Sequence, residues 1–125
     1  KFQPQVMREI NHFLADFRTG EVHPIDTGLL DFLYLLQQKT AKQGHFEVIS
    51  AYRSPKTNAM LRNASSGVAK KSLHMLGQAL DIRLPGTDLR ELQKAALNEK
   101  MGGVGLYTGS NFIHVDTGRV RNWGS

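Results

Sequence analysis

Hydrophobic residues recur at two different spacings along the chain, and the spacing predicts the secondary structure. In the first third, apolar residues return every three or four positions, which is typical of helices with one buried face. One such stretch covers residues 4–17 and a leucine-rich one covers residues 27–42, with Asp26 or Thr27 as its cap and Gly44 beyond its end. The two helices are expected to place the following residues in a hydrophobic core: Phe13, Leu30, Leu33 and Leu36.

Short alternating segments in the rest of the chain predict strands. Residues 45–52 are rich in β-branched and aromatic side chains, and residues 78–84 alternate between a polar and an apolar face. Residues 104–107 and 111–115 flank a polar turn at residues 108–110, which predicts a β-hairpin.

Two further helices are predicted between these strands. Ser54 and the proline after it are typical of a cap and first turn, which starts a helix over residues 55–62. Asp88, with a glutamate three residues later, is a candidate capping pair for a helix to residue 100. Helices in the first half and antiparallel strands toward the end predict an α+β fold, a small antiparallel sheet with helices packed on it. With no repeat or linker, residues 1–125 are expected to form a single domain.

Composition narrows the class of protein. Hydrophobic residues at 40% and charged residues at 22% are typical of a folded domain, and no apolar run approaches the roughly 20 residues of a membrane helix. We therefore expect a soluble body without a transmembrane segment. The absence of cysteine excludes disulfides, thiolate metal ligands and a cysteine nucleophile. Because the chain begins at Lys1 and not at methionine, we expect a processed chain whose export signal is no longer present.

The net charge of +5 predicts an anionic partner, which can be nucleic acid, a membrane surface or an acidic polymer. A nucleic-acid-binding domain would show clustered basic residues interleaved with aromatic ones. The one adjacent basic pair is Lys70 and Lys71, and the aromatic residues follow core-like spacings. We therefore expect a generally basic surface and no nucleic-acid partner.

Three residues carry candidate metal chemistry. His74 lies in a predicted loop, Gly77 can supply a turn, and Asp81 follows on the polar face of the next strand. His114 lies on a later strand whose apolar neighbours face the other way. Two imidazoles and one carboxylate match a catalytic zinc site with an open position for water. Each residue alone also fits a structural role, so the residues by themselves leave both interpretations open, although aspartate is depleted in strands.

Three segments resemble one family. They are S-A-Y-R-S-P at residues 50–55, S-L-H to A-L-D across residues 72–81, and N-F-I-H-V-D-T-G at residues 111–118. Together they resemble the murein endopeptidases of the MepK (YcbK) type, within the superfamily of D-Ala-D-Ala metallopeptidases, lysostaphin-like peptidases and hedgehog domains. The resemblance extends over nearly the whole chain, since residues 16–36 also look like the family's amino-terminal half.

The resemblance implies an α+β fold with a zinc ion on the sheet face, held by His74, Asp81 and His114. It implies a zinc metallopeptidase that hydrolyses peptide cross-links of peptidoglycan, between two diaminopimelate residues. A cut at a D-Ala-diaminopimelate bond, carboxypeptidase action, or a non-catalytic zinc-containing wall-binding module remain alternatives. The implied partners are peptidoglycan stem peptides, and the expected location is the periplasm or cell envelope. We expect a monomer.

The resemblance also implies roles for residues around the metal site, and some of these residues have two possible roles. Arg53 matches an arginine that binds a substrate carboxylate or polarises the scissile carbonyl, tasks that suit a guanidinium. Ser72 can contact substrate or hold its loop, and His23 is a candidate for the substrate groove.

The general base is the open question. Several superfamily members carry an acid three residues before the last histidine ligand, and others carry a histidine two before it. Here those positions hold Asn111 and Phe112, which cannot accept a proton at neutral pH. Asp116, two residues after His114, is therefore the candidate base, and the alternative is that it orients a ligand imidazole.

Overall fold

A computed structural model of the protein describes residues 5, 8, 11, 13–16, 18–40, 46–64 and 72–124. The helical elements, in chain order, are α2 (Thr27–Thr40), α3 (Pro55–Ala64), the short 3₁₀ helix η1 (Leu73–Leu76) and α4 (Leu89–Glu99). The strands are β1 (Glu47–Ser50), β2 (Ala79–Arg83), β3 (Gly103–Tyr107), β4 (Phe112–Asp116) and β5 (Arg121–Gly124).

The strands form one sheet in the order β1-β2-β4-β3-β5. β2 pairs antiparallel with β1 and with β4, and β3 and β4 form the predicted hairpin. β5, which the sequence pattern did not reveal, pairs parallel with β3 at the edge of the sheet. The α+β fold is therefore confirmed, and the sheet is mixed because of this last strand.

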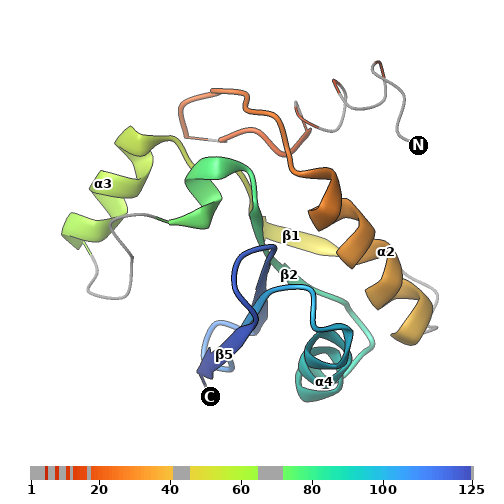
Figure 1. Ribbon diagram of the computed structural model, residues 1–125. Helices are drawn as coiled ribbons and strands as arrows, with labels where there is room; N and C mark the ends of the chain where they lie inside the picture. The colour runs from red at the N-terminus through yellow and green to blue at the C-terminus, as the bar shows by residue number, and fades with distance from the viewer. Residues whose placement is uncertain are drawn as a thin grey trace.

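The hydrophobic core lies between α2, α4 and one face of the sheet. Figure 1 shows α2 and α4 together on one side of the sheet, with α3 apart from them. Alternation along each strand sends one set of apolar side chains to this face, where they meet the helices. The core residues with essentially no exposure include Leu29, Phe32, Leu36, Leu80, Ile82, Leu92, Ile113 and Val115. The residues that alternate with them on β2 and β4 face the other side.

Local signals fix several element boundaries as predicted. The Asp26 side chain accepts a hydrogen bond from the Gly28 amide at the start of α2, and Ser54 accepts one from the Thr57 amide at the start of α3. Gly77 ends η1 in the left-handed conformation, with φ of 68°. A side chain at this position would collide with the Pro24 carbonyl oxygen, so the turn that leads into β2 requires glycine.

Two predictions about the helices are wrong. Phe13, which was expected in the core, is 80% exposed, whereas the neighbouring Leu14 is buried. Asp88 occupies the cap position of α4 but its side chain makes no capping hydrogen bond.

Several predictions concern residues that lie outside the part of the chain that the structure describes. Most of the predicted helix at residues 4–17 lies there, although Gln5, Arg8, Asn11 and Phe13 are helical. The predicted extension of α2 to residue 42 lies outside the described residues as well. In the part of the chain that is described, no helix is long and apolar enough to cross a bilayer.

Candidate metal centre

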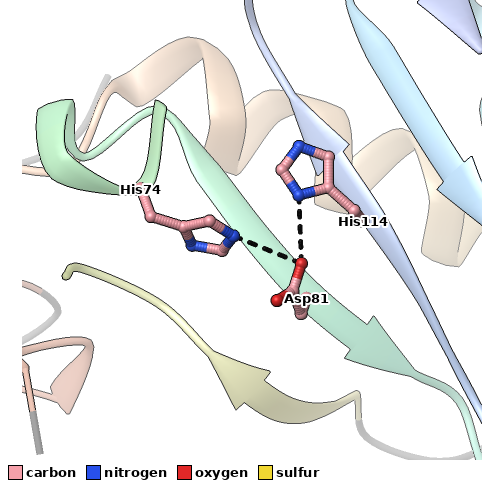
Figure 2. A group of neighbouring side chains, drawn as sticks. All are labelled: His74, Asp81 and His114. Carbon is pink, nitrogen blue, oxygen red and sulfur yellow. Dashed lines mark hydrogen bonds and ion pairs between the residues drawn. The ribbon is translucent and has the colours of Figure 1, made fainter. Parts of the chain in front are cut away.

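His74, Asp81 and His114 converge on one side of the sheet, as Figure 2 shows. One ligand atom from each lies within 4.8 Å of the others. Asp81 Oδ1 lies 3.3 Å from His74 Nε2 and 3.0 Å from His114 Nδ1. Asp81 and His114 are direct neighbours in the β2–β4 register, while η1 delivers His74 from just before β2. The predicted convergence of these three side chains is therefore present in the structure.

The His74 ring is held with one particular nitrogen toward the cluster. His74 Nδ1 lies 2.8 Å from the Ala51 carbonyl oxygen, which can only accept a hydrogen bond, so this nitrogen carries the proton. His74 Nε2 is then left with a lone pair that points at Asp81. A backbone acceptor that fixes a ring in this way is typical of metal-binding histidines.

The His114 ring has a carboxylate oxygen beside each of its nitrogens. His114 Nε2 lies 2.7 Å from Asp116 Oδ2, and Nδ1 faces Asp81. With the proton on the nitrogen that faces Asp116, the lone pair of Nδ1 points into the cluster. Two imidazole lone pairs and a carboxylate oxygen then meet with no proton between them, which is an arrangement that can hold a metal ion.

The close approach of these groups shifts the pKa values of Asp81 and His114. Burial would raise the pKa of Asp81, but the adjacent imidazoles of His114 and His74 hold it well below its usual value. Burial would likewise lower the pKa of His114, while the carboxylates of Asp116 and Asp81 raise it. The site therefore keeps its carboxylates ionised and favours positive charge beside them, whether from a proton or from a metal ion.

Arg53 lies at the edge of this centre. Its backbone amide donates to the His74 carbonyl, and its guanidinium donates to Asn58 Oδ1 at 3.2 Å and more weakly to Ser50 Oγ at 3.5 Å. Burial lowers the pKa of Arg53, and the charge of Asp81 opposes that effect. The group stays protonated at any working pH, so it supplies a fixed positive charge near Asp81.

Ser72 and His23 take positions around η1. Ser72 Oγ caps η1 by accepting a hydrogen bond from the His74 amide at 3.1 Å, which holds the segment that carries His74. His23 stacks on Tyr52, with ring centroids 4.9 Å apart, and its Nδ1 lies 2.8 Å from the Pro24 carbonyl oxygen. These contacts give both side chains structural partners beside the site. The remaining histidines, His12 and His45, lie outside the described residues.

Asp116 is fully buried and both of its oxygens are engaged. Oδ1 accepts hydrogen bonds from the amides of Gly103 and Gly118 and from Arg121 Nη1, at 2.8, 2.9 and 3.0 Å. Oδ2 accepts from His114 Nε2 at 2.7 Å and from Arg121 Nη2 at 2.9 Å. A carboxylate offers about four lone-pair sites, so these contacts leave none for a water molecule. They match the orienting alternative for Asp116 better than the role of base.

The sequence interpretation missed two residues beside the centre, Arg121 and Trp123. The Trp123 ring lies 5.1 Å from the His114 ring, and its Nε1 donates to the Tyr107 hydroxyl at 2.7 Å. The Arg121 guanidinium lies 4.9 Å from the centroid of the Trp123 ring. The available signal was the alternation of Arg121 and Trp123 after a glycine, which puts both side chains on one face of a short strand.

A small α+β domain that gathers two imidazoles and a carboxylate on one sheet face has the donor set of a metal-dependent hydrolase. A family model described as peptidoglycan L,D-endopeptidase MepK matches residues 1–123. The chain belongs to this family.

Curated relatives agree with that assignment. The chain is 47% identical to the peptidoglycan L,D-endopeptidase MepK of Escherichia coli K12 over 117 residues, which are 94% of this chain and 64% of the relative. The protein of the same name from Shigella flexneri matches equally well. A probable peptidoglycan L,D-endopeptidase MepK from Haemophilus influenzae is 43% identical over 123 residues, 98% of this chain and 66% of the relative. The chain thus spans about two thirds of these relatives, and no solved structure matches it significantly.

Proposed function

We propose that this protein is a zinc-dependent peptidoglycan endopeptidase. The observation that carries the proposal is the cluster of His74, Asp81 and His114, whose free lone pairs converge within 4.8 Å in a chain of the MepK family. Zinc bound tetrahedrally at about 2.0–2.2 Å keeps its ligand atoms roughly 3.3–3.6 Å apart. The separations of 3.0 and 3.3 Å around Asp81 Oδ1 are close to that spacing.

The three side chains would hold the zinc ion through His74 Nε2, an Asp81 carboxylate oxygen and His114 Nδ1. When bound, zinc with an open coordination position supplies a water of lowered pKa and polarises a carbonyl. The protein's own contribution is to keep both histidines in the correct tautomer, through the Ala51 carbonyl and Asp116.

Arg53 is proposed to bind the substrate. Its fixed charge lies at the edge of the cluster, where it can pair with a stem-peptide carboxylate or stabilise the oxyanion that forms at the scissile carbonyl. Asn58 and Ser50 hold the guanidinium and limit its freedom. Ser72 is proposed to hold the loop of His74, and His23 to support Tyr52 beside it.

The proposed substrate bond is an L,D peptide bond in a cross-link, as the names of the relatives state for those proteins. A cross-link between two diaminopimelate residues contains such a bond. The net charge of +5 favours approach to the anionic cell wall. Since peptidoglycan lies in the cell envelope, the proposed activity implies an envelope or periplasmic location.

Purified protein incubated with zinc and defined muropeptide dimers tests the proposal, with the products identified by mass spectrometry. Dimers linked through two diaminopimelate residues should be cleaved, whereas D-Ala-diaminopimelate dimers should be cleaved much more slowly. A monomeric stem peptide in the same assay reveals any carboxypeptidase action.

A non-catalytic zinc-containing module is the second candidate, and the feature that favours it is the absence of an acid at Asn111. Zinc binding without cleavage of any dimer between pH 5 and 9 would support the module and contradict the peptidase.

A further inference from the structure

Two glycines of β3 leave space above the strand for side chains from β5. Gly103 and Gly105 lie on the face that carries the metal cluster, directly between β4 and the edge strand β5. A side chain at Gly105 would come within 2.6 Å of the Trp123 ring, and one at Gly103 would overlap the Arg121 guanidinium. Because both positions lack a side chain, residues of β5 can reach over β3 to the cluster.

Arg121 uses this space to reach Asp116. Its two terminal nitrogens bond the two carboxylate oxygens, Nη1 to Oδ1 at 3.0 Å and Nη2 to Oδ2 at 2.9 Å. Nη1 also donates to the Arg119 carbonyl at 2.8 Å, which fixes the plane of the guanidinium. A bidentate pair of this kind sets the orientation of the carboxylate as well as neutralising its charge.

Asp116 in turn orients the ring of His114 through a hydrogen bond. Asp116 Oδ2, one of the two oxygens that Arg121 bonds, lies 2.7 Å from His114 Nε2. The opposite nitrogen of the same ring, Nδ1, is the one that faces Asp81. A continuous chain of hydrogen bonds therefore runs from the edge strand to the candidate ligand atom.

We infer that Arg121 is a positioning residue, which acts through Asp116 to hold His114 Nδ1 in place for the metal. The inference rests on the proposed zinc site and adds to it a contribution from β5. Partners that orient a ligand histidine typically change metal affinity by about 10–100-fold when they are removed. Arg121 should have an effect of that size although it does not touch the metal.

The test is a double-mutant cycle on the zinc dissociation constant, measured by competition with a chromophoric chelator. The variants are Arg121→Gln, Asp116→Asn and the two combined. If Arg121 acts through Asp116, each single variant weakens zinc binding about 10–100-fold and the double variant is no weaker than Asp116→Asn alone. If Arg121 acted only on general stability, its effect would add to that of Asp116→Asn.

Arg90→Gln is the matched control, because it removes an exposed arginine from α4 and should leave zinc affinity within twofold of the unmodified protein. Circular dichroism checks that every variant is folded. Should Arg121→Gln fail to fold, Arg121→Lys takes its place in the cycle, since it keeps the charge and loses the two-pronged contact. Unchanged zinc affinity in a folded Arg121 variant, or additive effects in the cycle, would overturn the inference. An unmodified protein that binds no zinc would instead contradict the proposed function.

Discussion

At the scale of single residues, the most informative feature is that each candidate ligand histidine has a partner on its outer nitrogen. The Ala51 carbonyl holds His74 and Asp116 holds His114, so the inner nitrogens are free for a metal ion. The types and spacing of the three candidate ligands were predictable from the sequence. Their outer partners were not, because a backbone carbonyl leaves no trace in a sequence and Asp116 fitted two roles equally well.

His74→Ala should abolish zinc binding and peptidase activity together. The change removes a ligand lone pair, so zinc affinity should fall by more than the roughly 100-fold typical of an outer partner. Isothermal titration with zinc and the muropeptide assay give the two readouts. His23→Ala removes a nearby imidazole that lies outside the cluster, and it should bind zinc as the unmodified protein does. Equal zinc affinity in both variants would remove His74 from the site.

Asp16 is a second residue whose environment gives a definite prediction. It is buried and accepts hydrogen bonds from the amides of Ser54 and Arg18, both at 2.8 Å. Burial would raise the pKa of Asp16, but these hydrogen bonds lower it to about 2. The bond to Ser54 connects the segment before α2 to the start of α3, 38 residues away.

Asp16→Asn should lower the free energy of unfolding by about 1–3 kcal/mol at neutral pH. Because the folded pKa is depressed, the carboxylate contributes fully above the unfolded value of about 4 and loses its contribution as the pH falls toward 2. The difference between the two proteins should therefore shrink over that range. Urea unfolding at pH 7, 4 and 2.5 measures it, and a gap that stays constant with pH would contradict the assigned environment.

At the scale of elements, the alternation of polar and apolar residues predicted β2 and β4, which carry candidate ligands. It did not predict β5, whose side chains contact that site. β2 and β4 are half-buried strands with a clear apolar face, so Asp81 and His114 could be assigned to the opposite face. β5 is four residues long, none of them fully buried, and it pairs with β3, which is not the strand that precedes it in the chain. No local sequence signal specifies such a pairing. The space over Gly103 and Gly105 that the side chains of β5 occupy exists only after the sheet has formed.

Gly105→Ala should disturb the Trp123 ring. The added methyl group would come within 2.6 Å of the indole, so the ring or the edge strand must shift, at a cost of about 1–3 kcal/mol. Trp123 is the single tryptophan of the chain, and its fluorescence therefore reports the change directly. Gly109→Ala is the control, because nothing lies within 4 Å of the added atom in the hairpin turn. Identical emission spectra for the two variants would contradict the described packing.

At the scale of the whole molecule, the two faces of the sheet have separate tasks. One face packs on α2 and α4 to form the core, and the other carries the candidate ligands. The general plan could be predicted from periodicity, since alternation on β2 and β4 requires that core and ligands take opposite faces. The orientation of Phe13 could not be predicted in this way, and Phe13 proved to be exposed where a core residue was expected.

Removal of zinc should lower the stability of the entire domain. A ligand that binds only the folded state, at a free concentration 100 times its dissociation constant, adds about 2.7 kcal/mol. For a chain of 125 residues this corresponds to about 10 °C in melting temperature. Differential scanning calorimetry with and without a chelator measures the shift. His74→Ala, which lacks a ligand, should melt at the same temperature under both conditions, and a chelator effect of equal size in that variant would point to another zinc site.

The cross-strand register has a consequence for how such a protein can vary in length. One row of paired residues crosses all five strands, with one residue on each strand: Ser50, Asp81, His114, Gly105 and Trp123. Because side chains alternate faces, one inserted or deleted residue within β3 or β4 would turn the rest of that strand over. Loop enlargement at the hairpin tip would leave this alignment untouched. Natural insertions and engineered grafts should therefore be accepted at residues 108–110 and rejected within the strands on either side.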